Sequence, residues 1–141
     1  MNAVDELEAQ IKELAYRLWQ VDGSPQDPER AGEFLDVAAA LLTDEKEYGA
    51  FQGRIRERAD NVWQDDGRRP DRYEEFRQTA EKMVLREYLA RWRRIQERAY
   101  FIWVEAGCPE GFSKEHWAQA RKIEEEEEEE EEERKQPPPS E

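Results

Sequence analysis

The chain has 141 residues and a formal net charge of −14, with 41% charged residues. Residues 1–50 and 122–141 carry −8 each, whereas residues 51–121 carry +2, so only the middle could meet nucleic acid. No apolar run approaches the ~20 residues of a membrane span, and the acidic first residues do not resemble a secretory signal. A lone Cys108 permits no intramolecular disulfide, so we expect a cytoplasmic protein.

One sequence pattern of about 40 residues occurs three times, which is typical of a supersecondary unit copied in tandem. Each copy places an apolar residue, an alanine, a second apolar residue and a tryptophan at i, i+4, i+7 and i+8, and a glycine four residues later. The copies begin at Ile11, Ile55 and Ile95. The first four positions lie on one face of an α-helix.

The glycine of each copy stands where a helix commonly ends in a left-handed residue, and a proline follows it within three residues. We therefore expect each first helix to end at its glycine. The tryptophans are interpreted as buried anchors rather than an aromatic ligand pocket, because so small a unit has few other large residues to bury. The expected structural anchors are Trp19, Gly23, Trp63, Gly67, Trp103, Gly107 and Trp117.

A second helix follows each turn and begins at a capping side chain. The expected caps are Asp27 before Pro28, Asp71 in a capping box with Glu74, and Ser113. Across each pair of helices we expect the tryptophan to face the aromatic residue of the second helix. These pairs are Trp19 with Phe34, Trp63 with Phe76, and Trp103 with Trp117.

The joints between copies differ. Gly49 and Gly53 predict a break between the first and second copies. No glycine or proline occurs between Asp71 and Ala106, so one helix of about 30 residues or two helices with a bend near residues 88–92 both fit. The sequence thus predicts an all-α fold of three tandem helical hairpins sharing one core. The expected boundaries are 1–45, 52–90 and 91–123, followed by a disordered acidic tail at 124–141.

The acidic tail contains ten consecutive glutamates, residues 124–133. Each is a good helix former, but like charges four residues apart repel each other. The tail could therefore continue the last helix and then fray. Three prolines at 137–139 cannot be helical.

The third copy resembles a bacterial family described as domain of unknown function 2934. It contains Arg98-Ala99-Tyr100-x-x-Trp103, then Gly107-x-Pro109-x-Gly111, then His116-Trp117, and the likeness is strongest over residues 94–121. The second copy departs from the pattern because Asp60 replaces the tyrosine, and the first has Leu14 in place of the arginine. The resemblance implies a small soluble helical module and brings no catalytic residues.

Candidates for chemistry are few. Glutamates at 13, 57 and 97 share one repeat position, but no second titratable group repeats with them, so we place them on the polar face. Cys108 and His116 could form a nucleophile pair, but neither recurs in the other copies and two ligands are too few for a metal site. We expect no enzyme activity, cofactor or metal.

A basic and aromatic stripe is the candidate interaction surface. Three interpretations remain open: a solvated helix face, a docking site for an acidic partner or for the chain's own tail, and a site for single-stranded nucleic acid. The stripe comprises Arg86, Tyr88, Arg91, Trp92, Arg93, Arg94 and Arg98.

The favoured function is therefore a protein–protein interaction or adaptor module with an unknown partner, because repeats form extended surfaces and no convergent polar site is evident. The alternative is an electrostatic regulator whose glutamate tail engages a basic or nucleic-acid-binding partner. Direct binding to nucleic acid and to membranes is not expected.

Overall fold

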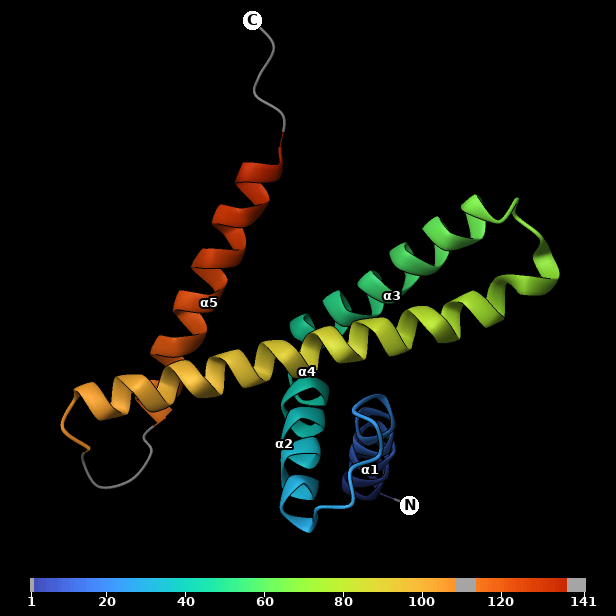
Figure 1. The fold of residues 1–141 in the computed structure, drawn as a ribbon. Coiled ribbons are helices and arrows are strands. Elements are labelled where there is room, and N and C mark those ends of the chain that lie inside the picture. Colours follow the sequence, from blue (N-terminus) through green and yellow to red (C-terminus); the bar gives the residue numbers. More distant parts are fainter. Residues whose placement is uncertain (1, 109–113, 137–141) are drawn as a thin grey trace, which may run out of the picture. The chain divides into compact units, whose positions relative to one another are not determined.

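The computed structural model describes residues 2–108 and 114–136 (Figure 1). All regular structure in these residues is helical, which confirms the all-α prediction. Short 3-10 turns, η1 and η2, precede α2 and α4. The elements are α1 (Ala3–Val21), η1 (Pro28–Arg30), α2 (Ala31–Leu42), α3 (Glu45–Asp65), η2 (Pro70–Arg72), α4 (Tyr73–Glu105) and α5 (Lys114–Lys135).

The chain divides into two compact units, Met1–Leu89 and Ala90–Glu141, where the sequence predicted a single core. The unbroken helix α4 contributes residues to both units. Of the two possibilities left open for residues 71–106, one continuous helix, Tyr73–Glu105, is therefore the observed one.

The first unit, unit 1, consists of α1, α2, α3 and the first part of α4. Helices α1 and α2 lie side by side (Figure 1), and Leu18 from α1 and Ala38 from α2 are fully buried. Helices α3 and α4 meet through an edge-to-face contact between Phe51 and Tyr88, whose ring centroids lie 5.2 Å apart. Arg54 also donates a hydrogen bond of 3.1 Å to the Tyr88 hydroxyl. Apolar packing together with several polar links, among them this bond and the Arg58–Glu87 ion pair, holds this helix pair.

The second unit, unit 2, consists of the last part of α4 and α5 and has a small core. Its buried residues are Ile95 and Ala99 from α4 and Ala120 from α5, with Ile102 and Trp117 packed against them. So few buried side chains supply limited hydrophobic stabilisation. Interactions outside this core must therefore contribute to the position of α5 on α4.

The three repeated glycines end their helices as predicted. Gly23, Gly67 and Gly107 have φ angles of +88°, +88° and +90°. In each copy the glycine N–H bonds to the carbonyl three residues back, and the next N–H bonds to the tryptophan carbonyl five residues back, as in Gly107 N to Val104 O (3.1 Å) and Cys108 N to Trp103 O (3.0 Å). This pattern is the Schellman motif.

The residue after each glycine is also left-handed, which the sequence did not reveal. Ser24, Arg68 and Cys108 have φ angles of +54°, +58° and +54°. A non-glycine residue in this region is unusual and costs conformational energy. Two successive left-handed residues therefore turn the chain sharply after each repeat helix.

The repeat tryptophans brace these turns from a half-buried position. The Trp19 indole N–H donates to the Pro25 carbonyl at 2.8 Å, and that of Trp63 donates to the Arg69 carbonyl at 2.9 Å. Each indole thus reaches six residues forward across its glycine. Trp103 is also half-buried, but Pro109, the corresponding residue of the third copy, lies outside the described residues.

The aromatic pairs differ from the expected ones. Trp19 lies against Tyr16 within α1, and Trp63 meets the ring of Tyr73 edge-on at 5.4 Å. Trp117 contacts Trp92, with ring centroids 4.5 Å apart. The N–H bonds of Trp19 and Trp63 direct these two indoles toward the turn rather than along the second helix.

One predicted helix start is retained and one is corrected. Asp27 caps η1 as expected, since its Oδ1 accepts from the Glu29 N–H at 3.0 Å. Asp71 caps nothing and lies inside η2, because Pro70 suits the first helical position and starts the turn one residue earlier. The predicted cap Ser113 lies outside the described residues.

The joint between the first two copies is also corrected. Gly49 and Gly53 lie inside α3, which starts at residue 45 rather than 52. Burial of Phe51 and Ile55 on the same helix outweighs the glycine penalty of about 1 kcal/mol per residue. The break falls instead at Asp44, whose Oδ1 accepts from the Glu47 N–H at 3.1 Å and caps α3.

The predicted disorder of the tail is wrong for residues 124–135, because α5 runs through them to Lys135. Glutamate favours helix, and part of the run lies against arginines that offset its self-repulsion, as described below. Residues 137–141 lie outside the described part of the chain.

The departure of the second copy from the family pattern has a structural counterpart. Asp60, which stands where the pattern has tyrosine, accepts a hydrogen bond of 2.9 Å from the Tyr73 hydroxyl. This bond raises the pKa of Tyr73 above its ordinary 10.0, and burial and the charge of Asp60 add to the effect. The pair ties the end of α3 to the start of α4.

Two glycines of one helix and its turn provide a matched test of the helix boundary. A Cβ would meet nothing within 4 Å at either Gly53 or Gly67, so only backbone conformation distinguishes them. We expect Gly67→Ala to destabilise by about 1 kcal/mol because of its positive φ, and Gly53→Ala to stabilise by about 0.5–1 kcal/mol. Chemical denaturation of both variants measures this, and shifts of the same sign would contradict the assignment.

The Tyr73–Asp60 hydrogen bond predicts a pH dependence at alkaline pH. A raised pKa in the folded state means that its stabilisation is present below pH 10.0 and is lost as the pH rises through the folded value. We expect Asp60→Asn to lower the pKa of Tyr73 in an NMR titration of the tyrosine rings, with Tyr73→Phe identifying the signal. An unchanged pKa in Asp60→Asn would show that Asp60 is not its cause.

Candidate functional site

Three arginines of the predicted stripe bind the chain's own glutamates within unit 2. The Arg91 Nε lies 2.7 Å from Glu128 Oε1, and the Arg94 Nε lies 2.8 Å from Glu124 Oε1. We call Arg91, Arg94 and Arg98 the arginine row and residues 124–133 the acidic segment. They occupy positions i, i+3 and i+7 of α4, so they share one side of the helix.

The third pair of the row has the most specific geometry. Arg98 donates through two nitrogens, with Nη1 2.9 Å from Glu127 Oε1 and Nη2 2.9 Å from Glu127 Oε2. Such a two-point contact uses the planar guanidinium in a way that lysine cannot. The row can therefore hold carboxylates in a defined orientation.

Burial strengthens two of the pairs. Glu124 is only 4% exposed and is the buried charged residue of the described chain, and it is compensated by Arg94. The Arg91 side chain is 16% exposed and also lies 3.9 Å from Glu125. Removing one partner of such a pair leaves a poorly solvated charge, which costs more than losing an exposed pair.

The remaining stripe residues are divided between the two units. Arg86 and Tyr88 belong to unit 1, where the Arg86 Nε reaches the Val21 carbonyl at 3.4 Å and Tyr88 is buried against Phe51. Trp92 is half-buried against Trp117, and Arg93 is half-buried in unit 2. The second half of the predicted stripe thus lies in the unit that also contains the acidic segment.

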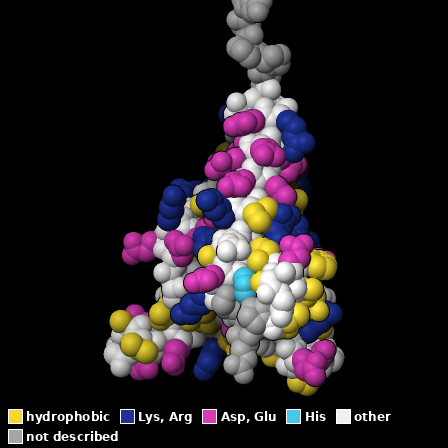
Figure 2. Space-filling model, turned by 90° about the vertical axis from the view of Figure 1, so that its left-hand side faces the viewer, with side chains coloured by type: hydrophobic (Ala, Val, Ile, Leu, Met, Phe, Trp, Pro, Cys, Tyr) yellow, Lys and Arg dark blue, Asp and Glu magenta, His cyan; other side chains and the backbone are white. Residues whose placement is uncertain are grey.

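The other face of the acidic segment carries glutamates without these partners. Glu126, Glu129, Glu130 and Glu133 are exposed and form no ion pair within the described residues. Figure 2 shows acidic side chains along α5, with basic side chains beside part of the helix. The acidic segment is therefore neutralised on one side only.

The candidates for chemistry do not gather into a site. Cys108 is exposed after the end of α4, whereas His116 is half-buried in α5. Glu13 pairs with Arg17, but Glu57 and Glu97, which share its repeat position, are exposed on their helices. Within residues 2–108 and 114–136, no three His, Cys, Asp or Glu side chains are placed to hold a metal ion. In the same residues, no helix is apolar over enough length to cross a membrane.

A comparison with protein families confirms the resemblance seen in the third copy. Residues 90–123 match the family described as Protein of unknown function (DUF2934). No curated protein and no solved structure matches the chain significantly. The matched segment coincides with the start of unit 2 and includes the arginine row, but it stops where the acidic segment begins.

Sequence reasoning placed the tail on the arginine stripe as one of three alternatives but could not choose its contacts. Arginines and glutamates about 30 residues apart in the sequence indicate that the two segments attract each other. They do not indicate which glutamate meets which arginine. The signal for the register is Ala120, whose small side chain lets α5 approach Ala99 and so sets which glutamates meet the row.

If the arginine row stabilises the helix of the acidic segment, removing its charge should loosen that helix. We expect the triple variant Arg91→Gln, Arg94→Gln, Arg98→Gln to speed amide hydrogen exchange over residues 124–133 by roughly fivefold or more, for ~1 kcal/mol lost. The control with equal charge change is Lys12→Gln, Lys46→Gln, Lys82→Gln in unit 1. If residues 124–133 exchange their amide hydrogens at the same rate in the arginine variant and in the lysine variant, the acidic segment is helical without the arginine row.

Proposed function

We propose that this chain is a non-enzymatic protein-interaction module whose arginine row in unit 2 binds acidic protein segments. The supporting observation is that the row already holds carboxylates of the acidic segment, including the two-point contact of Arg98 with Glu127. A surface that binds glutamates within the chain has the donors and spacing to bind those of a partner.

The acidic segment acts in this proposal as a built-in competitor. It is joined to the row by a short connection, so its effective concentration is high, and an outside ligand must displace it. Three partly exposed pairs contribute in total ~1–2 kcal/mol, so they weaken an outside ligand by roughly 5- to 30-fold. Binding is thereby restricted to partners with several well-placed carboxylates or to conditions that release the segment.

A second function is favoured by the unpaired face of the acidic segment. Glu126, Glu129, Glu130 and Glu133 recur at i, i+3, i+4 and i+7, which places them along one line of the helix. A basic or nucleic-acid-binding protein would meet this line without displacing the arginine pairs. In that case the segment itself, and not the row, is the binding element.

The two functions are distinguished by testing a shortened chain and by comparing a negatively charged with a positively charged peptide probe. We expect a chain that ends at Lys122 to bind a fluorescent decaglutamate peptide about tenfold more tightly than the full chain at low salt, with the difference fading as salt screens it. Heparin and single-stranded DNA serve as polyanion comparisons. A decalysine peptide should bind the full chain only.

The full-length variant Glu124→Gln, Glu127→Gln, Glu128→Gln checks the same point without removing residues. It should reproduce most of the gain for decaglutamate, while Glu126→Gln, Glu129→Gln, Glu130→Gln has the same charge change and should not. If both triples bind decaglutamate equally, net charge alone is responsible and the row is not a specific site. If decalysine binds the chain and decaglutamate binds neither the full chain nor any of its variants, the second function replaces the first.

A further inference from the structure

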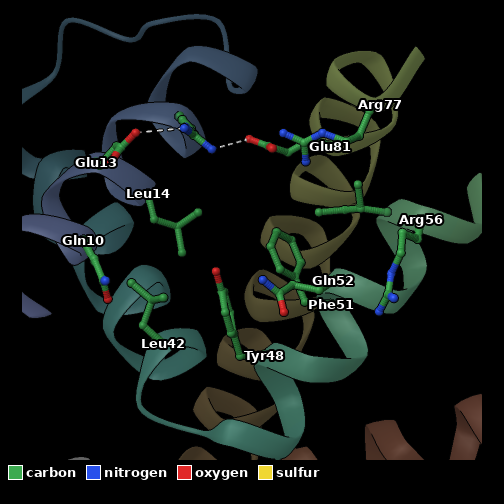
Figure 3. A pocket seen from close by; sticks show the side chains of 12 residues that line it. Gln10, Glu13, Leu14, Leu42, Tyr48, Phe51, Gln52, Arg56, Arg77 and Glu81 are labelled. Atoms are coloured by element: carbon green, nitrogen blue, oxygen red, sulfur yellow. Dashed lines mark hydrogen bonds and ion pairs between the residues drawn. The ribbon is translucent and has the colours of Figure 1, made fainter. Parts of the chain in front are cut away.

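Unit 1 contains an open pocket that the proposed function does not use. It has a volume of about 800 Å³ and is lined by side chains from α1, α2, α3 and α4 (Figure 3). This volume lies within the range of pockets that bind small molecules. The pocket therefore has room for a ligand rather than only for single water molecules.

The inner wall of the pocket is apolar. Leu14 from α1 and Phe51 and Ile55 from α3 line it and are 9%, 4% and 6% exposed. Figure 3 shows Leu14 and Tyr48 directed into the same space from opposite sides. A hydrocarbon chain or ring placed there would contact these apolar side chains at the pocket wall.

Polar groups with unused hydrogen-bonding capacity stand at the same pocket. The Tyr48 hydroxyl and the Gln52 amide line it and form no hydrogen bond within the described residues. Tyr48 is half-buried, so its hydroxyl is partly withdrawn from solvent. A few such groups among apolar side chains are typical of sites that orient a ligand.

The charges around the pocket leave a positive surplus. Arg17 is balanced by Glu13 and Glu81, each at 2.8 Å, as the dashed lines in Figure 3 indicate. Arg56 forms no ion pair within the described residues, and Arg77 has only an exposed pair of 3.3 Å with Glu74. These two guanidinium groups can donate hydrogen bonds to the carboxylate of a ligand.

We propose that this pocket binds a small amphipathic carboxylate, an aliphatic or aromatic acid with one apolar body. The apolar body covers Leu14 and Phe51, and the carboxylate binds Arg56 or Arg77, with the Tyr48 hydroxyl as a further donor. This site lies in the other unit from the arginine row, so it can be correct or wrong independently of the proposed function.

The test compares two probes of equal length and different charge on the full chain. Backbone amide NMR shifts are followed during titration with octanoate and with octanol. We expect saturable shifts in α1 and α3 for both, and octanoate to bind about tenfold more tightly because of its charge-assisted hydrogen bonds. Arg56→Gln with Arg77→Gln should remove most of this preference, whereas Lys46→Gln on the same helix α3 should keep it.

Tyr48→Phe removes one hydroxyl at nearly constant shape and should weaken octanoate binding about threefold or more, with octanol less affected. The proposal is overturned if octanoate causes no saturable shift in unit 1, if octanol binds equally well, or if the double arginine variant keeps the preference. Octanoate shifts confined to residues 91–98 would mean that the acid binds the arginine row instead, which also overturns it.

Discussion

The paired left-handed residues after each repeat tryptophan are the constraint on which the rest of the structure depends. Gly67 and Arg68, with φ angles of +88° and +58°, reverse the chain after α3 and let α4 run back along it. The tryptophan secures the reversal twice, because its carbonyl accepts the Arg68 N–H and its indole donates to the Arg69 carbonyl. One tryptophan thus bonds, through its backbone and its side chain, to both residues that follow the glycine, which explains why tryptophan and glycine recur together at a fixed spacing.

Features set by local chemistry were predictable from the sequence, whereas features set by packing were not. The helix ends at Gly23, Gly67 and Gly107 follow from the conformational freedom of glycine, and the cap at Asp27 follows from its side chain. The prediction of a helix break at Gly53 is wrong, because the burial of neighbouring residues on α3 stabilises the helix and this burial exists only in the folded chain. The opposite charges of the candidate site were predictable from the sequence, but the pairing of individual arginines and glutamates was not. That pairing depends on how closely α5 approaches α4 at Ala120.

The acidic segment shows how charge can oppose and then favour the same structure. Ten glutamates in one helix repel each other at every turn, which led to the prediction of disorder. Guanidinium groups on α4 relieve this repulsion on one side, as for Glu127 with Arg98. The opposite side keeps its negative charges in solvent, where water and salt screen them. The helix is therefore most strongly fixed where its partners lie and least fixed toward Lys135.

Unit 2 combines a small core with the ion pairs that we propose as its binding groups, and this has a consequence for any partner. Because the buried set of Ile95, Ala99 and Ala120 is so limited, displacement of the acidic segment removes part of what holds α5 in place. A ligand that binds the arginine row must then both replace the carboxylates and restore the lost stabilisation. A partner that presents its glutamates on a helix of its own can do both, since it offers the same spacing of charges together with apolar contacts. Extended acidic chains supply only the charges, so the row should discriminate in favour of helical acidic segments.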